Sequence, residues 1–169
     1  MLNTIKTTFG FLLSVIGKYT PLNFEGNTIE DTYNYLKIAD SLTTSGQPTE
    51  KQFHLIKKSN YETVINLAPT SVLENSLKTE QLLLQELEIE YIHIPVDFKN
   101  PTEEDFQKFS NCLQASQDQK VWVHCAANAR VSAFIYRYRC SVLGEDEEMA
   151  KIDLQKIWEP IGVWKKFIS

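Results

Sequence analysis

Short runs of β-forming residues alternate with amphipathic segments along most of the chain, and this alternation constrains the fold more than any other feature. The pattern predicts strands at 35–38, 41–44, 63–67, 91–96 and 121–124. It predicts helices beginning at Thr49, spanning 74–88 and 102–117, running from after Cys125 to Gly144, and spanning 145–158. Chains of this kind form a sheet covered by helices. We therefore predict an α/β fold of three layers, in which helices cover both faces of a central, mostly parallel sheet of four to five strands.

The chain has 169 residues, a length that fits one domain with a sizeable core. We predict an N-terminal appendage at 1–28 and a single α/β domain at 29–169. The apolar run at 9–16 is too short to span a bilayer, so it predicts either a docked helix or part of a signal-like segment. If 9–16 forms a docked helix, we predict a cytoplasmic location. If residues 1–20 act as a signal, we predict export. Any membrane association would depend on 9–16.

Charge and cysteine content exclude several classes of protein. The net charge is -5, which argues against a general nucleic-acid binder, because such proteins need a basic surface. Three cysteines without short spacing predict reduced thiols, and three widely spaced histidines provide no zinc ligand set. The arginines are concentrated: all of them, Arg130, Arg137 and Arg139, follow Cys125 within fifteen residues.

Polar residues follow three of the predicted strands. Asn66, Asp97 and Cys125 each stand at or just past a strand end. In open α/β sheets the chemistry collects beyond the carboxyl ends of the strands. We therefore expect these three side chains to converge on one edge of the sheet.

The segment from Val121 to Ser132 predicts a strand, a short tight loop and then a helix. A cysteine at the helix N-terminus, as Cys125 would be, is favoured as a thiolate by the helix dipole and the free backbone N–H groups. Those N–H groups can also surround a tetrahedral oxyanion, two of whose oxygens a nearby arginine can bind. Helical periodicity places Arg130 and Arg137 on one flank of the helix and turns Arg139 toward solvent.

These residues resemble the protein tyrosine and dual-specificity phosphatases, which carry His-Cys, a phosphate-binding loop, an arginine and then Ser or Thr. The strands at 64–67 and 94–97 also look like their counterparts in that family. Residues 32–168 resemble more closely a group of bacterial tyrosine-phosphatase-like proteins. The segments that carry this closer resemblance are Thr44-Ser45-Gly46-Gln47-Pro48-Thr49, His93-Ile94-Pro95-Val96-Asp97-Phe98 and His124-Cys125-Ala126-Ala127-Asn128.

The resemblance implies a phosphocysteine mechanism that needs no metal and no cofactor. Cys125 would attack phosphorus, Asp97 would protonate the leaving group and later activate water, and Ser132 would support departure of the thiolate. The phosphate-binding loop would consist of Ala126, Ala127, Asn128, Ala129 and Arg130. His124, Asn66 and Arg137 would support the site. The substrate would be a phosphorylated protein or a small phosphomonoester.

The loop departs from the family pattern at two positions. Four residues separate Cys125 from Arg130 where the family has five, yet Ser132 keeps the family's spacing, so that Val131 stands where the arginine is expected. Either the loop is tighter and Arg130 still reaches the phosphate, or the loop is conventional and its arginine has moved. Asn128 replaces the usual glycine, and asparagine is among the residues that best tolerate a left-handed backbone.

Each site residue also has a structural alternative. Cys125 could be a small buried hydrophobe, Arg130 and Arg137 could form structural ion pairs, and Ser132 could be an ordinary hydroxyl at a helix start. Asp97 could turn the chain toward Pro101, with Asp105 as a rival acid. Other cysteines, Cys112 and Cys140, are predicted to pack.

Two other functions remain open. One is a catalytically weak or inactive phosphate-binding pseudophosphatase, which the displaced arginine would favour. The other is a rhodanese-like sulfurtransferase, because that family also uses a Cys-x4-Arg loop, although it would leave Asp97 without a role.

Overall fold

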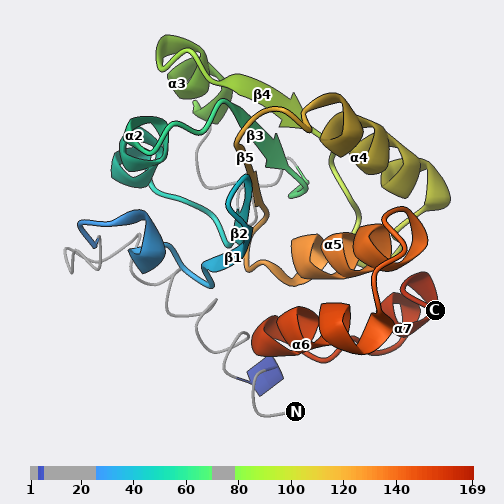
Figure 1. The fold of residues 1–169 in the computed structure, drawn as a ribbon. Helices are drawn as coiled ribbons and strands as arrows, with labels where there is room; N and C mark the ends of the chain where they lie inside the picture. The colour runs from blue at the N-terminus through green and yellow to red at the C-terminus, as the bar shows by residue number, and fades with distance from the viewer. Residues whose placement is uncertain (1–3, 6–25, 70–78) are drawn as a thin grey trace.

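The computed structural model describes residues 4–5, 26–69 and 79–169, and these form a five-stranded sheet flanked by helices (Figure 1). The strands are β1 (Leu36–Ala39), β2 (Leu42–Ser45), β3 (Thr63–Asn66), β4 (Glu90–His93) and β5 (Val121–His124). The helical elements are η1 (Ile29–Asp31), α2 (Glu50–Lys58), α3 (Glu80–Glu86), α4 (Glu103–Ala115), α5 (Ala129–Ser141), α6 (Glu147–Ile157) and α7 (Val163–Phe167). The predicted three-layer α/β fold is confirmed.

The sheet has the order β1-β2-β5-β3-β4, in which β1 is antiparallel to β2 and the other pairs are parallel. The central strand β5 is buried along its whole length, as its continuous apolar run predicts for a strand covered on both faces. In the parallel register, Ser45 and Asn66 both lie opposite His124. The parallel strands therefore end at one level, directly before Cys125.

Two separate cores cover the two faces of the sheet. Trp122 of β5 packs in the smaller core with Phe53 of α2 and Leu84 of α3. Its neighbours Val121 and Val123 belong to the larger core, which includes residues of α4, α5, α6 and α7. Figure 1 shows α2 and α3 on one side of the sheet and these four helices on the other. Because side chains alternate along a strand, His124 points toward the first face and Cys125 joins the second core.

Most predicted elements lie within a few residues of the observed ones, and local sequence explains why. The helix predicted from Thr49 begins there because Thr49 and Gln52 form a capping box, and a second capping box at Thr102 and Asp105 begins α4. Of the helix predicted over 74–88, the part up to residue 78 lies outside the described residues, and α3 covers Glu80–Glu86.

Helix α7 was missed by the sequence analysis. It has five residues, too few to be stable alone, and it forms because Trp164 and Phe167 are buried in the larger core. Burial of a large aromatic side chain contributes about 1.5–3 kcal/mol.

The proposed division into an appendage and a domain falls largely outside the described residues, as does the apolar run at 9–16, and both stay predictions. No helix in the described part of the chain has the length and apolar character needed to cross a bilayer.

Candidate active site

Cys125 lies between the end of β5 and the start of α5, where the sequence analysis placed it. Its side chain is almost fully buried, with 1% exposed. Its backbone N–H donates to the carbonyl of Ser45, over 3.4 Å between N and O. Helix α5 begins four residues later at Ala129, and no acidic residue lies in its first turn. The positive end of α5 is therefore free of acidic side chains of its own.

Asn128 turns the chain into α5. Its φ of 65° is left-handed, as predicted from its position at the family's glycine. The buried side chain adds contacts that glycine could not make, because Nδ2 donates to the carbonyl of Asn34 at 2.8 Å and to Oγ1 of Thr44 at 3.0 Å. In return Asn34 Nδ2 donates to the carbonyl of Ala127 at 2.9 Å. The loop is thus fixed from both sides.

The segment after β2 also approaches the loop closely. The backbone N–H of Gln47 donates to the carbonyl of Ala126 over 3.2 Å. A Cβ atom at Gly46 would lie only 2.7 Å from a ring carbon of Tyr33 and 3.0 Å from the Ala126 oxygen. Only glycine fits this approach, which explains the Gly46 in the sequence segment that carried the resemblance.

Arg130 is the second residue of α5, and its side chain is 4% exposed. The guanidinium carbon lies 5.2 Å from the centre of the Phe98 ring. Phe98 directly follows Asp97, so the displaced arginine lies beside the segment that carries the candidate acid. An arginine over an aromatic face is held by the ring quadrupole.

Asp97 and its rival Asp105 have different environments. Asp97 is exposed, and its Oδ1 accepts a local hydrogen bond from the N–H of Lys99, at 2.9 Å. The carboxylate of Asp105 caps α4, accepting from the N–H and the hydroxyl of Thr102 at 3.1 and 2.6 Å. Asp105 is therefore engaged in helix capping, and Asp97 is the better candidate acid.

Three aromatic side chains hold the segment that follows Asp97, and we call Phe98, Trp158 and Trp164 the aromatic brace. The Phe98 ring centre lies 5.8 Å from that of Trp158 and 5.2 Å from that of Trp164. Trp164 Nε1 donates to the carbonyl oxygen of Phe98 at 2.8 Å. The missed helix α7 thus anchors the backbone next to the candidate acid.

On the opposite face of the sheet, a group of polar side chains surrounds the carboxylate of Glu80 at the start of α3. We call this group, Gln47, Asn66, Glu80, Tyr91 and His124, the polar hub. Oε1 of Glu80 accepts from Asn66 Nδ2 at 2.9 Å and faces Nε2 of His124 at 3.1 Å. Oε2 accepts from Gln47 Nε2 at 2.6 Å. Asn66 Nδ2 also donates to the Tyr91 hydroxyl, over 3.1 Å.

The hub holds Glu80 as a carboxylate. Its burial favours the neutral acid, but the hydrogen bonds from His124, Gln47 and Tyr91 together lower the pKa of Glu80. Burial, and then the nearby Glu80 charge, raise the pKa of Tyr91, which keeps its hydroxyl protonated. The Tyr91 hydroxyl therefore acts as a donor toward Glu80.

The sequence analysis found part of the hub. It expected Asn66 to brace the site and His124 to hold the loop, and both make buried hydrogen bonds to Glu80. It missed Glu80, Gln47 and Tyr91. The position of Glu80 in the first turn of α3 is common for an acid, so the sequence held no signal that this carboxylate is buried.

The remaining predicted site residues lie farther along α5. Ser132 donates its hydroxyl to the carbonyl of Ala129 at 3.0 Å and lines a small pocket between β1, α5 and α6. Arg137 pairs with Glu103 at 2.6 Å and lies 4.1 Å from the Phe106 ring centre, which is the structural alternative left open above.

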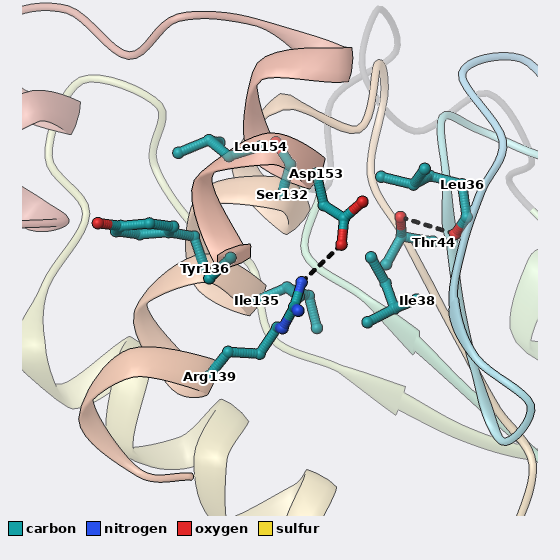
Figure 2. Close-up of a pocket in the computed structure, with 10 residues that line it drawn as sticks. Leu36, Ile38, Thr44, Ser132, Ile135, Tyr136, Arg139, Asp153 and Leu154 are labelled. Atoms are coloured by element: carbon teal, nitrogen blue, oxygen red, sulfur yellow. Dashed lines mark hydrogen bonds and ion pairs between the residues drawn. The ribbon is translucent and has the colours of Figure 1, made fainter. Parts of the chain in front are cut away.

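Arg139 corrects a prediction. The sequence analysis turned it toward solvent, but its side chain is only 13% exposed and pairs with Asp153 at 2.7 Å and Glu145 at 2.8 Å. Figure 2 shows this arginine facing Asp153 across the pocket. The acids that attract it lie on and just before α6, and the helical periodicity of α5 gives no information about them.

The other cysteines are poor candidates for a nucleophile. Burial raises the pKa of both the Cys112 and the Cys140 thiols, so both stay protonated at neutral pH. Among the described residues, no group of three or more His, Cys, Asp or Glu side chains is arranged to hold a metal ion.

A family model shows which family the chain belongs to. Residues 14–158 match the model of the family described as "DSP-PTPase phosphatase fused to NAD+ Kinase". The chain is 30% identical over 95 residues to a beta-lactamase hydrolase-like protein of Xylella fastidiosa, an alignment that covers 55% of this chain and 22% of that protein. The chain therefore spans only about a fifth of the length of this curated relative.

Solved structures show the same fold. A DUF442 phosphatase candidate from Shewanella putrefaciens CN-32 is 29% identical, with a TM-score of 0.72, over 83% of this chain and 91% of that one. The catalytic core of the PP-IP phosphatase Siw14 from S. cerevisiae is 15% identical, with a TM-score of 0.68, over 81% of this chain and 84% of that one. TpbA of P. aeruginosa, in complex with pTyr, is 18% identical, with a TM-score of 0.61, over 80% of each chain.

Proposed function

The chain belongs to the family described as DSP-PTPase phosphatase fused to NAD+ kinase, and on this premise we propose that it hydrolyses phosphomonoesters through a phosphocysteine intermediate without a metal ion. The proposal concerns the phosphatase part of that description, because the Cys125 loop lies within the matched residues. The substrate would be a phosphorylated protein or a small phosphomonoester.

One observation carries the proposal. Cys125 stands at the end of the central parallel strand, and a loop with a left-handed Asn128 leads from it into the N-terminus of α5. This arrangement supplies a nucleophile and a set of backbone N–H groups at the positive end of a helix. The Arg130 guanidinium lies over the ring of Phe98, the residue after Asp97, and this contact supports a role for both Arg130 and Asp97 at the loop.

The reaction would proceed in two steps. In the first, the Cys125 thiolate attacks phosphorus, the bond from phosphorus to the leaving oxygen breaks, and Asp97 gives its proton to that oxygen. In the second, water attacks the phosphocysteine, Asp97 takes a proton from it, and the bond between sulfur and phosphorus breaks to release phosphate. Arg130 and the backbone N–H groups of residues 126–130 would bind the phosphoryl oxygens in both steps.

Phosphate release from p-nitrophenyl phosphate tests the proposal. We expect metal-independent turnover that vanadate inhibits and that Cys125→Ser abolishes. Cys112→Ser is the matched control, because Cys112 lies on α4, has a raised pKa and should leave turnover unchanged. Turnover that survives Cys125→Ser would contradict the mechanism.

A second candidate is a phosphate-binding protein with little or no turnover. The hydroxyl of Ser132 favours it, because it donates to Ala129 and so is already engaged within α5. Calorimetric binding of phosphate or vanadate, without hydrolysis across a panel of phosphotyrosine, phosphoserine and small phosphomonoesters, would select this alternative.

A further inference from the structure

The polar hub connects all the parallel strands at the edge of the sheet where Cys125 lies. Asn66 ends β3, His124 ends β5, Tyr91 lies on β4, and Gln47 follows β2 by two residues. Their donors converge on the one carboxylate of Glu80, which is 2% exposed. A carboxylate offers about four acceptor positions. The hub therefore has a single acceptor group, the Glu80 carboxylate, at its centre and donors all around it.

This arrangement fixes which nitrogen of His124 carries a proton. An ionised carboxylate can only accept hydrogen bonds, so the His124 Nε2 that faces Glu80 Oε1 at 3.1 Å must be the protonated nitrogen. The other nitrogen, Nδ1, is buried and has no hydrogen-bond partner among the residues that the structure describes. A proton on Nδ1 would bury an unmatched donor, at a cost of about 1–3 kcal/mol. The neutral ring with its proton on Nε2 satisfies both observations.

The ring of His124 is confined as well as oriented. It is fully buried and meets the ring of Phe53 edge-on, with 5.8 Å between the ring centres. Its hydrogen bond to Glu80 therefore selects one ring orientation inside a packed cavity. His124 is the last residue of β5, and its backbone leads directly into Cys125.

From these contacts we propose that Glu80 is a positioning residue of the catalytic centre: its acceptor oxygen holds His124 in the Nε2-protonated form and so sets the backbone from which Cys125 attacks phosphorus. The inference rests on the proposed function for its effect on turnover. The state of the His124 ring is independent of turnover. Glu80 touches no reacting atom and would act only through His124.

The central experiment replaces the acceptor while keeping the length of the side chain. In Glu80→Met, Nε2 loses its acceptor, and we expect the nitrogen-15 NMR shifts of His124 to lose the pure Nε2-protonated pattern. We expect kcat for p-nitrophenyl phosphate to fall by about 10- to 100-fold, because a small misplacement of the nucleophile has effects of this size, while KM stays unchanged.

Glu80→Gln serves as the conservative rescue variant. Glutamine keeps one acceptor oxygen that can face His124, so both the ring pattern and most of the kcat should return. Glu86→Met is the matched control, because Glu86 is exposed on the same helix and should change neither measurement. A kcat for folded Glu80→Met equal to that of the wild type would overturn the positioning role.

The wild-type protein provides a test that does not depend on folding of any variant. At neutral pH the NMR spectrum should show His124 with its proton on Nε2. A proton on Nδ1 would refute the proposal even if the protein is an active phosphatase. If the ring has the expected state and no phosphate is ever released, the proposed function fails while the assignment of His124 stands.

Discussion

The polar hub and the aromatic brace hold the two sides of the candidate active site by different physical means. The hub fixes the backbone before Cys125 through directional hydrogen bonds to a buried charge, on the face of the sheet covered by α2 and α3. The brace fixes the backbone after Asp97 through ring contacts and one hydrogen bond, on the face covered by α4 to α7. Charge networks require particular partner atoms, whereas packed rings require mainly volume and shape.

This difference suggests that the hub and the brace have separate roles in the site. A nucleophile that must stand in line with phosphorus benefits from a rigid support, and a buried charge with its acceptor positions filled provides one. The candidate acid Asp97 is exposed, and its carboxylate accepts a hydrogen bond from the backbone N–H of Lys99, in the segment that the brace anchors. Disruption of the hub should therefore affect every substrate, and disruption of the brace should affect the substrates that need an acid.

Arg130 lies beside the brace, over the Phe98 ring, and its replacement should have the largest effect. Lysine at position 130 keeps the charge but loses the planar fork that binds two phosphoryl oxygens. We expect Arg130→Lys to lower kcat/KM by about 100- to 1,000-fold, the usual cost of removing a group that stabilises the transition state.

Arg137→Lys provides the comparison for that measurement. Arg137 also lies over a phenylalanine ring, but it pairs with Glu103, so its replacement should reduce thermal stability more than activity. Equal losses of kcat/KM in the two variants would mean that Arg130 does not act in the site and is only a packing residue.

A smaller and more selective effect is expected from the brace. Trp164→Phe keeps an aromatic ring but removes the N–H that donates to the carbonyl of Phe98. We expect kcat to fall by about 10-fold for an alkyl phosphate, whose leaving group needs a proton, and to change little for p-nitrophenyl phosphate, whose leaving group does not.

Trp158, another member of the brace, provides the control. The indole N–H of Trp158 is buried without a hydrogen-bond partner among the described residues, so Trp158→Phe removes no such bond. This variant should match the wild type on both substrates. If Trp164→Phe slows both substrates equally, the brace supports the whole fold rather than the acid.

The same contrast explains what the sequence could predict. The helix starts at Thr49 and Thr102 and the left-handed Asn128 depend on neighbouring residues, and these were predicted close to where they lie. The hub and the brace join residues far apart in the chain: Gln47 meets Glu80, and Phe98 meets Trp164. Glu80 has the pattern of an ordinary acid at a helix start, and α7 is too short to show periodicity. Partners of this kind become visible only after the chain has folded.

The smallest expected effect concerns stability, and it separates the charge of the hub from its hydrogen bonds. The folded state lowers the pKa of Glu80, so the folded protein releases this proton more readily than the unfolded chain does. The contribution of the Glu80 carboxylate to stability is therefore complete above the pKa of about 4.3 that it has in the unfolded chain. This contribution is lost as the pH falls through the lower pKa of the folded state. Glu80→Gln cannot titrate, so its urea midpoint should decline less than that of the wild type as the pH falls through this range.

The brace contains no titrating group, so a Trp164→Phe variant should follow the wild-type dependence on pH. If the urea midpoints of Glu80→Gln and the wild type change with pH in parallel, the hub carries no buried charge. The two sides of the site would then differ only in that one is held by hydrogen bonds and the other by packing.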